Sequence, residues 1–383
     1  MANSRNVSII LVENVNEALK QIAKYKRTQL KIPVVAITGS VGKTSTKDLI
    51  ASVLSQKYKV LKTQGNMNNN IGMPMTILKI KDEDCLVVEM GMNHFGEIRE
   101  LTNIAKPSIA VITNIGTAHI GNLGSRENIL KAKLEILEGL QENNVVINND
   151  NDLLHKWYLE NKNNKKYNII TFGIKETESK VCACNIKNFE DKTVFDAVIK
   201  DNGNKIRKEI TLKMLGDHFI LDSLSAIAVG NYFNIPMEEI AKGIKDVNLT
   251  QKRMELEKAK NGALIINDTY NANYDSMKAA ITYLQSVKDR RKIAVLGDML
   301  ELGNYSEELH KNVGKCITDV DILITVGKES KNIENEAKAK EKYHFNNNED
   351  AIKKLKEIMT KDDIILLKAS NSMKFGEIVN AIL

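Results

Sequence analysis

Apolar and polar positions form two kinds of stretch along residues 34–172. Short runs of β-branched and other apolar residues predict buried strands at Val34–Thr38, Cys85–Glu89, Ile109–Thr113, Val145–Ile147 and Asn168–Phe172. Between several of these runs, apolar residues recur at helical spacing, as in Ser45–Ser55 and Ile129–Leu140. Strands that alternate with amphipathic helices are typical of a parallel sheet covered by helices, so we expect an α/β fold.

The pattern changes over residues 181–212 and then returns. Helical spacing vanishes there and strict alternation takes over, which predicts an antiparallel insertion or sheet edge. After Gln251 the first pattern resumes, with strands expected at Ala263–Asn267, Lys292–Leu296, Ile322–Val326 and Ile364–Leu367 and helices at Ser276–Val287 and Asn348–Met359. This region of about 130 residues has an ordinary domain size. We therefore expect a second, C-terminal, Rossmann-like α/β domain.

Composition narrows the classes of function. The net charge of +6 comes from 55 Lys+Arg against 49 Asp+Glu without a polybasic block, so it fits small anionic substrates and does not imply nucleic acid. No disulfide framework or zinc spacing is expected from the four cysteines, Cys85, Cys182, Cys184 and Cys316. The sequence has no signal-peptide core and no apolar stretch of about 18 residues, which a membrane span needs. We expect a cytoplasmic protein without membrane insertion.

The segment VVAITGSVGKTSTKDLI, residues 34–50, contains the clearest chemical signal. A predicted strand leads into a glycine-rich loop that opens a helix, which is the setting of a phosphate-binding P-loop. Lys43 would lie on the β- and γ-phosphates of a nucleotide and Thr44 on Mg²⁺. The common spacing needs glycine at position 37, where this chain has Ile37, so the match is to a shorter G-x-x-G-K-T variant. A glycine turn that merely caps a helix is the alternative. The predicted ATP-binding residues here are Gly39, Ser40, Val41, Gly42, Lys43, Thr44 and Ser45.

A P-loop needs a carboxylate for its metal ion at the end of a neighbouring strand. Glu89 ends the apolar run CLVVE and is the predicted ligand. His119, in TNIGTAH, and Lys133, in a helical stretch, are weak signals by themselves, because a lone histidine is more often a polar contact and a helical lysine is usually solvated.

Seven segments in order resemble the Mur ligase family. They read GSVGKTS, GNMNNNIGMP, VVEMGMNHFGEI, TNIGTAH, ENILKAKLEI, NDTYNAN and VLGDMLELG, and three of them are most similar to the MurF type, UDP-N-acetylmuramoyl-tripeptide:D-alanyl-D-alanine ligase. The resemblance implies ATP-dependent amide formation through an acyl phosphate, in peptidoglycan precursor synthesis, from a small carboxylate and a small amine. It implies a monomer.

The same resemblance assigns roles to residues. Thr44 and Glu89 would hold one Mg²⁺ and His119 a second one beside Lys133, which is carbamylated in the family. Two cations would offset the repulsion between the γ-phosphate and an incoming carboxylate. Nucleotide-contacting positions of the second domain are matched by Arg253, Asp268 and Asn271, and the path of the carboxylate substrate is matched by Asn66, Asn68 and Asn69.

The chain departs from the family at several positions. Val7–Arg27 resembles only the tail of the domain that binds the UDP-sugar, which leaves open a ligase for a different carboxylate in specialised metabolism. Phe219 and Asp222 stand where the family usually has asparagines, and Lys368–Met373 departs from a late family motif. A GTPase-type switch, suggested by Thr360–Asp363, and a non-catalytic scaffold are further alternatives. We expect three segments: residues 1–32, a remnant of the N-terminal domain; 33–249, a central P-loop domain; and 250–383, a C-terminal Mur ligase domain.

Overall fold

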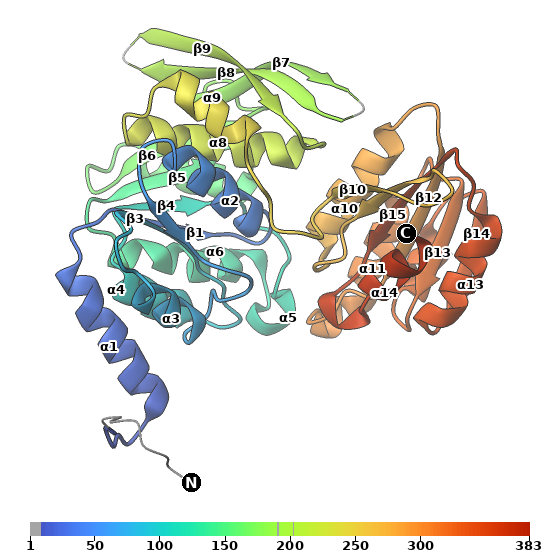
Figure 1. Ribbon diagram of the computed structural model, residues 1–383, viewed down its shortest axis with the longest axis horizontal. Helices are drawn as coiled ribbons and strands as arrows, with labels where there is room; N and C mark the ends of the chain where they lie inside the picture. Colours follow the sequence, from blue (N-terminus) through green and yellow to red (C-terminus); the bar gives the residue numbers. More distant parts are fainter. Residues whose placement is uncertain (1–8, 190, 202) are drawn as a thin grey trace.

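The computed structural model describes residues 9–189, 191–201 and 203–383, and it contains two lobes, each built on its own sheet. Figure 1 shows the lobes side by side, joined by the chain that leads from α9 to β10. The central lobe has a sheet in the order β2-β3-β1-β4-β5-β6-β7-β8-β9, and the C-terminal lobe has one in the order β10-β11-β15-β12-β13-β14. Among the described residues, no helix is long and apolar enough to cross a membrane.

The central sheet is parallel from β2 to β7 and antiparallel from β7 to β9. Its strands are β1 (Val34–Thr38), β2 (Val60–Lys62), β3 (Cys85–Glu89), β4 (Ile109–Ile112), β5 (Asn144–Asn148), β6 (Asn168–Gly173), β7 (Val181–Asn188), β8 (Thr193–Asp201) and β9 (Asn204–Leu212). The antiparallel insertion predicted over residues 181–212 is confirmed. Strand β2 was not predicted, because it has only 3 residues.

Helices cover both faces of this sheet. They are α1 (Val15–Gln29), α2 (Lys43–Leu54), α3 (Gly72–Leu78), α4 (Glu97–Ala105), α5 (Ile120–Leu123), α6 (Arg126–Leu134), the 3₁₀ turn Glu135–Gly139, α7 (Asp152–Asn161), α8 (Asp217–Tyr232) and α9 (Met237–Lys245). Val35 and Ile37 of β1 belong to the core formed with α2 and α8, whereas Val34 and Ala36 point to the opposite face, toward α3 and α4. The run VVAIT is wholly apolar up to its last residue because both faces are buried.

One predicted helix is wrong in its extent. The stretch Ile129–Leu140 was expected to be one helix, but α6 ends at Leu134 and a 3₁₀ turn follows. The hydroxyl of Thr102 donates to the carbonyl of Ile136, and a Cβ on Gly139 would lie 2.3 Å from the carbonyl oxygen of Thr102. This close contact with α4 accompanies the change from α-helix to the tighter 3₁₀ turn. The spacing of apolar residues along the chain does not predict such a tertiary contact.

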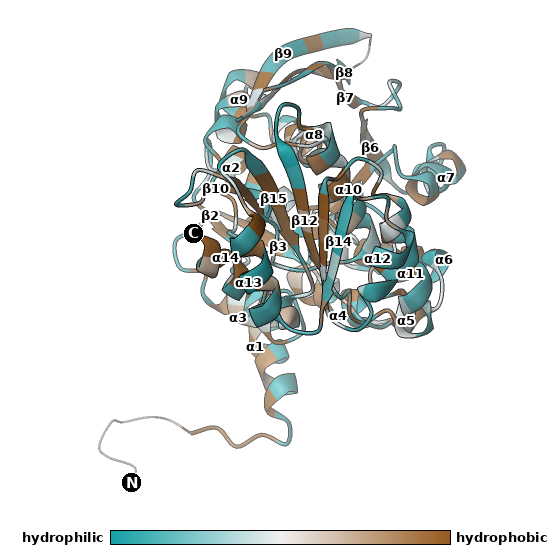
Figure 2. Ribbon diagram, turned by 90° about the vertical axis from the view of Figure 1, so that its right-hand side faces the viewer, coloured by the Kyte–Doolittle hydropathy of each residue, from teal (hydrophilic) through white to brown (hydrophobic). Residues whose placement is uncertain are grey.

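The C-terminal lobe is a second helix-covered sheet. It consists of β10 (Glu255–Lys258), β11 (Leu264–Asn267), α10 (Tyr274–Ser286), β12 (Arg291–Gly297), the 3₁₀ turn Gly303–Tyr305, α11 (Ser306–Lys315), β13 (Ile322–Val326), α12 (Lys331–Glu336), β14 (Glu341–Phe345), α13 (Asn348–Ile358), β15 (Asp363–Lys368), the 3₁₀ turn Asn371–Met373 and α14 (Gly376–Ile382). In Figure 2 the apolar β12 and β15 lie between α13 and α14 on one side and α11 and α12 on the other. The α/β fold is confirmed. The division at residues 32/33 and 249/250 stays a prediction, and residues 1–8 of its first segment lie outside the described residues.

The register of the parallel strands places the predicted site residues at one edge of each sheet. Ile37 pairs with Glu89 and Thr38 with Ile112, so the carboxyl ends of β1, β3 and β4 meet at the same edge. In the C-terminal lobe, Asn267 pairs with Leu367, so the residues that follow β11 and β15 also meet. The P-loop and Glu89 therefore lie together, as predicted, and Thr113 lies beside them at the carboxyl ends of the parallel strands, where ligand sites of such sheets are found.

Candidate active site

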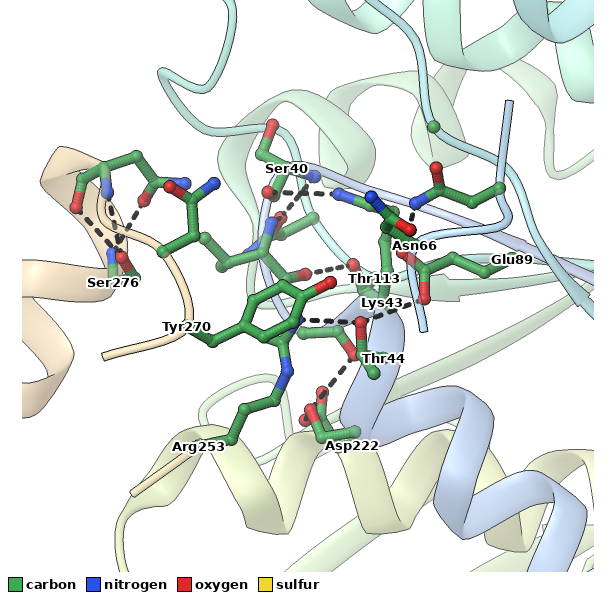
Figure 3. A pocket seen from close by; sticks show the side chains of 18 of the residues that line it. Ser40, Lys43, Thr44, Asn66, Glu89, Thr113, Asp222, Arg253, Tyr270 and Ser276 are labelled. Carbon is green, nitrogen blue, oxygen red and sulfur yellow. Dashed lines mark hydrogen bonds between the residues drawn. The ribbon is translucent and has the colours of Figure 1, made fainter. Parts of the chain in front are cut away.

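A cavity of about 840 Å³ lies between the two lobes. All predicted site residues line it except Gly39 and Lys133. It is also lined by residues for which no role was predicted, among them Thr113, Asn114, His218, Asp222, Tyr270, Glu301 and Lys368. Figure 3 shows Lys43, Thr44, Glu89, Arg253 and Tyr270 converging on it from both lobes.

The P-loop is held in shape by the loop that follows β4. Asn114 accepts hydrogen bonds from the backbone N–H groups of Ser40 and Val41 at 3.0 and 2.9 Å, and the hydroxyl of Thr113 donates to the carbonyl of Val41 at 2.6 Å. Gly39 must be glycine, because a Cβ there would lie 1.8 Å from the hydroxyl oxygen of Thr113. Asn114 was within a quoted motif but had no assigned role, since its partner lies 73 residues earlier in the chain.

Gly42 starts α2 in the left-handed region, with φ at 78°. A Cβ on it would lie 2.7 Å from a carboxylate oxygen of Asp222, so only glycine fits between the loop and α8. Lys43 folds back and donates to the carbonyl of Gly39 at 2.8 Å. Burial lowers the pKa of this lysine, opposed by the charge of Glu89.

Thr44, Glu89 and Arg253 form one connected group. The hydroxyl of Thr44 donates to Glu89 at 2.9 Å and accepts from the guanidinium of Arg253 at 2.9 Å. The second carboxylate oxygen of Glu89 accepts from the side chain of Asn68 at 2.8 Å. Arg253 also stacks on Tyr270, with its Cζ 4.1 Å from the ring centroid. Arg253 therefore reaches the P-loop helix from the chain between the lobes, while its predicted contact with the nucleotide phosphates stays a prediction.

The three predicted asparagines differ in what they do. Asn68 reaches Glu89, whereas the side chain of Asn69 accepts from the backbone N–H groups of Ile71 and Gly72 at the start of α3. Asn66 is exposed and lines the cavity. A substrate contact is therefore open to Asn66, while Asn69 has a structural partner.

His119 lies at the lobe boundary. Its φ is 64°, unusual for a residue that is not glycine, and its Nδ1 lies 3.2 Å from Oε2 of Glu301 yet makes no hydrogen bond of acceptable geometry. Burial, and next the charges of Lys43 and Lys133, lower the pKa of His119 to about 4. The imidazole is therefore neutral at physiological pH, the form that binds a metal ion.

Lys133 is 1% exposed, and no hydrogen bond or ion pair of its side chain is found within the described part of the chain. Burial lowers its pKa well below the usual value, and the charge of Lys43 adds to the effect. No cluster of three or more His, Cys, Asp or Glu side chains suited to a metal ion occurs in residues 9–189, 191–201 and 203–383. Among the predicted metal ligands, only Thr44 and Glu89 are joined by a hydrogen bond.

In the C-terminal lobe, Asp268 is paired with a buried lysine. Its carboxylate lies 2.5 Å from Nζ of Lys368, which also donates to the carbonyl of Asn271 at 2.9 Å. Burial lowers the pKa of Lys368 against the attraction of Asp268. The two predicted nucleotide-contacting positions, Asp268 and Asn271, are thus tied together by one side chain from β15.

Family models match both lobes. The model described as Mur ligase middle domain matches residues 37–230, and the one described as Mur ligase, glutamate ligase domain, matches residues 252–371. The chain belongs to the Mur ligase family.

Relatives within the Mur ligase family are similar in sequence over nearly the whole chain. The UDP-N-acetylmuramoyl-tripeptide–D-alanyl-D-alanine ligase of Bacillus subtilis (strain 168) is 41% identical over 383 residues, covering 98% of this chain and 81% of that protein. The protein of the same name from Escherichia coli (strain K12) is 33% identical over 379 residues, covering 97% and 82%.

Solved structures of Mur ligases are similar as well. A crystal structure of MurF from Acinetobacter baumannii has a TM-score of 0.89 at 29% identity, covering 99% of this chain and 83% of that one. The MurF ligase from Thermotoga maritima in complex with ADP has a TM-score of 0.87 at 28% identity, covering 100% and 86%. The resemblance to the MurF type of Mur ligase is confirmed.

Proposed function

We propose that this chain is an ATP-dependent ligase that joins D-alanyl-D-alanine to the carboxylate of a UDP-N-acetylmuramoyl-tripeptide, releasing ADP and phosphate, in peptidoglycan precursor synthesis. The observation that carries the proposal is the group formed by Thr44, Glu89 and Arg253 inside the cavity between the lobes. The 41% identity to the Bacillus subtilis ligase supports the choice of substrates. We further propose that the enzyme acts as a monomer in the cytoplasm.

The reaction needs two bond exchanges. First, a carboxylate oxygen of the acceptor attacks the γ-phosphorus of ATP, the bond to the β–γ bridging oxygen breaks, and ADP leaves an acyl phosphate behind. Then the amine nitrogen attacks the acyl carbon, the amide forms, phosphate leaves and the nitrogen loses a proton. Lys43 from the P-loop and Arg253 from the linker would offset the repulsion between the two anions of the first step.

Thr44 and Glu89 would hold a Mg²⁺ ion. A hydroxyl and a carboxylate 2.9 Å apart at the start of a P-loop helix offer the oxygen ligands that Mg²⁺ prefers. The ion would neutralise charge on the nucleotide phosphates. Binding would require Arg253 to release the hydroxyl of Thr44, because the guanidinium occupies that oxygen in the present arrangement.

A second ion at His119, beside a carbamylated Lys133, is part of the proposal. A carbamate forms when a neutral amine attacks CO₂, with a C–N bond made and one proton released. Burial lowers the pKa of Lys133 well below its usual value and so increases the share of neutral amine, which favours this chemistry. The product is an anion with two oxygens, which suits Mg²⁺ better than an ammonium group does.

Phosphate release tests the proposal directly. The purified protein is incubated with ATP, Mg²⁺ and D-alanyl-D-alanine, with either UDP-N-acetylmuramoyl-tripeptide or a panel of other carboxylates. We expect stoichiometric ADP, phosphate and amide only with the UDP-linked tripeptide. Amide formation with another carboxylate but not with this one would favour the alternative, a Mur-ligase-like enzyme of specialised metabolism.

Lys43→Ala is the matched negative control. Within the described residues, the side chain of Lys43 donates only to carbonyls of its own loop, so its removal should leave the fold intact. Turnover should fall at least tenfold through the loss of its charge on the phosphates. Circular dichroism checks the fold and phosphate release the rate. A variant that keeps more than a tenth of wild-type turnover contradicts the P-loop assignment.

A further inference from the structure

One short segment of the central lobe, residues 116–124, makes several contacts with the C-terminal lobe. We call it the docking segment; it includes α5, which Figure 1 shows on the side of the central lobe that faces the C-terminal lobe. The backbone N–H and the hydroxyl of Thr117 both donate to Oδ2 of Asp275, at 2.7 and 3.0 Å. The hydroxyl of Tyr305 donates to the carbonyl of Gly124 at 2.6 Å. Both ends of the docking segment are therefore held by the other lobe.

The middle of the docking segment contacts backbone of the C-terminal lobe at Gly121. A Cβ on Gly121 would lie 2.8 Å from the carbonyl oxygen of Glu301 and 2.9 Å from the backbone nitrogen of Gly303. Neither is a flexible side-chain end, so the backbones could not stay in place around an added methyl group. The backbone of Gly121 has no positive φ, so alanine is compatible with the local conformation of α5. The position requires glycine because the lobes are docked.

His119 lies between these contacts. Its left-handed backbone is costly for a residue with a side chain and persists only where the surroundings hold it. The surroundings here include the C-terminal lobe: Asp275 holds Thr117 two residues before, and Gly121 meets Glu301 two residues after. Glu301 is itself left-handed, with φ at 64°, and points its carboxylate at Nδ1 of His119.

We propose that Asp275 and Gly121 are positioning residues through which docking of the C-terminal lobe sets the place of His119. His119 is then in its working position only when the lobes are together, although it belongs to the central lobe. Within the described residues, no hydrogen bond joins the side chain of Asp275 to the P-loop, so Asp275 acts on the segment of His119 and not on the P-loop directly. This inference rests on the proposed function for the use of His119, but the docking itself is measurable without turnover.

Gly121→Ala is the decisive variant, and Asn122→Ala is its matched control. Both add alanine to α5, but Asn122 is exposed, and no hydrogen bond or ion pair of its side chain is found within the described residues. Small-angle scattering of each protein with a non-hydrolysable ATP analogue measures the radius of gyration, which reports whether the lobes are docked. Fluorescence titration measures nucleotide affinity. For Gly121→Ala we expect a larger radius of gyration, turnover lowered at least tenfold, and a nucleotide affinity that falls only as far as the contacts of Asp268 and Asn271 are lost. Asn122→Ala should match wild type in all three.

Asp275 supplies a second test that does not add bulk. Asp275→Asn keeps a carbonyl oxygen that can accept from Thr117, whereas Asp275→Ala removes the acceptor. We expect the alanine variant to lower kcat at least tenfold with the KM for ATP unchanged, and the asparagine variant to recover most of the rate. Equal losses in both variants, or a change in KM for ATP alone, would overturn the role of Asp275.

The outcomes separate this inference from the proposed function. If Gly121→Ala keeps the wild-type radius and the wild-type nucleotide affinity, the inference is wrong, whatever the enzyme acts on. If wild-type protein releases no phosphate with UDP-N-acetylmuramoyl-tripeptide but Gly121→Ala still expands, the proposed substrate is wrong and the docking contact stands. A variant that is expanded yet turns over at the wild-type rate would overturn the link between docking and His119.

Discussion

Asp222 is a buried acid next to the P-loop, at a position where the sequence resemblance leads us to expect asparagine. It accepts hydrogen bonds from the hydroxyls of Ser45 and Thr46 at 2.5 and 2.9 Å. Burial raises its pKa to about 7, against those two hydroxyls and the charge of Arg253, which lower it. A sequence comparison can mark this residue as different, but only its burial makes it a titrating group near neutral pH.

The raised pKa of Asp222 predicts a pH effect on stability. Between its ordinary pKa of 3.8 and the folded pKa of about 7, the folded protein keeps a proton that the unfolded chain loses, so this contribution to stability falls as pH rises. At about 1.4 kcal/mol per unit, the loss amounts to at most about 4 kcal/mol. Urea unfolding from pH 4 to 8 should show a steeper decline for wild type than for Asp222→Asn.

Comparing the pH dependence of unfolding between wild type and Asp222→Asn removes the contribution of other titrating groups. His218, on the same helix, has its pKa lowered to about 4 by burial, and it titrates in both. Asp217→Asn is the matched control, since Asp217 is an exposed acid on the same helix. Parallel curves for wild type and Asp222→Asn would contradict the raised pKa.

Lys133 is the second residue whose charge state decides its role. A buried ammonium near His119 would repel metal ions, whereas a carbamate attracts them. Lys133→Ala should be nearly inactive, and added acetate should restore part of the rate because it supplies a detached carboxylate. Lys133→Arg should stay inactive, since arginine keeps the wrong charge. Amide formation is the measurement, and a Lys133→Arg enzyme with near wild-type rate would exclude the carbamate.

At the scale of elements, α1 is fastened to the central lobe by Lys20, Lys26 and Arg27, and Arg27 donates to the most carbonyls. Arg27 donates to the carbonyls of Leu30, Ala105 and Lys106, at 2.6, 2.7 and 3.1 Å. Two of these carbonyls are at the C-terminal end of α4, where Lys106 has a left-handed backbone. Burial lowers the pKa of Arg27. The rest of α1 is more open along its length: Val15, Ile22 and Tyr25 are exposed, and only Ala23 is buried in the helix.

Arg27→Ala should therefore destabilise the protein. Partly buried carbonyls would lose their donors, at a cost of about 1–3 kcal/mol in the free energy of unfolding. Urea denaturation measures this change in the free energy of unfolding. Lys24→Ala on the same helix is the control, because Lys24 is exposed and should change the free energy by less than about 0.5 kcal/mol. A similar small change for Arg27→Ala would show that α1 is not held by these bonds.

At the scale of the whole molecule, the active site is an interface. Arg253 touches Thr44 of one lobe and Tyr270 of the other, so it connects the nucleotide site with the lobe arrangement. Arg253→Lys keeps the charge but loses the planar group that stacks and donates. We expect small-angle scattering to show that wild type becomes more compact on adding an ATP analogue and acceptor, and we expect Arg253→Lys to abolish this compaction and to lower turnover at least tenfold. Compaction equal to that of wild type would contradict this role.

Much of the architecture is contained in local patterns. The runs at Val34–Thr38 and Cys85–Glu89 match β1 and β3 to the residue, because strands buried on both faces are apolar throughout. The P-loop and Glu89 could be predicted because their chemistry is local: a glycine loop, a helix start and an acid at a strand end. The edge strand β14, EKYHF, was missed because a half-exposed strand has no such run.

Contacts between distant segments could not be predicted in this way. Asn114 holds the P-loop, Asp222 braces it, and Asp275 and Glu301 reach the loop of His119 from the other lobe. Each depends on which side chains come within about 3 Å of a partner far away in the sequence, and spacing along the chain does not determine that distance. Most of the strands, several of the helices and the local motifs were therefore predictable from the sequence alone. Burial, the resulting pKa values and the contact of the lobes at Gly121 arise only when the two sheets and their helices pack together.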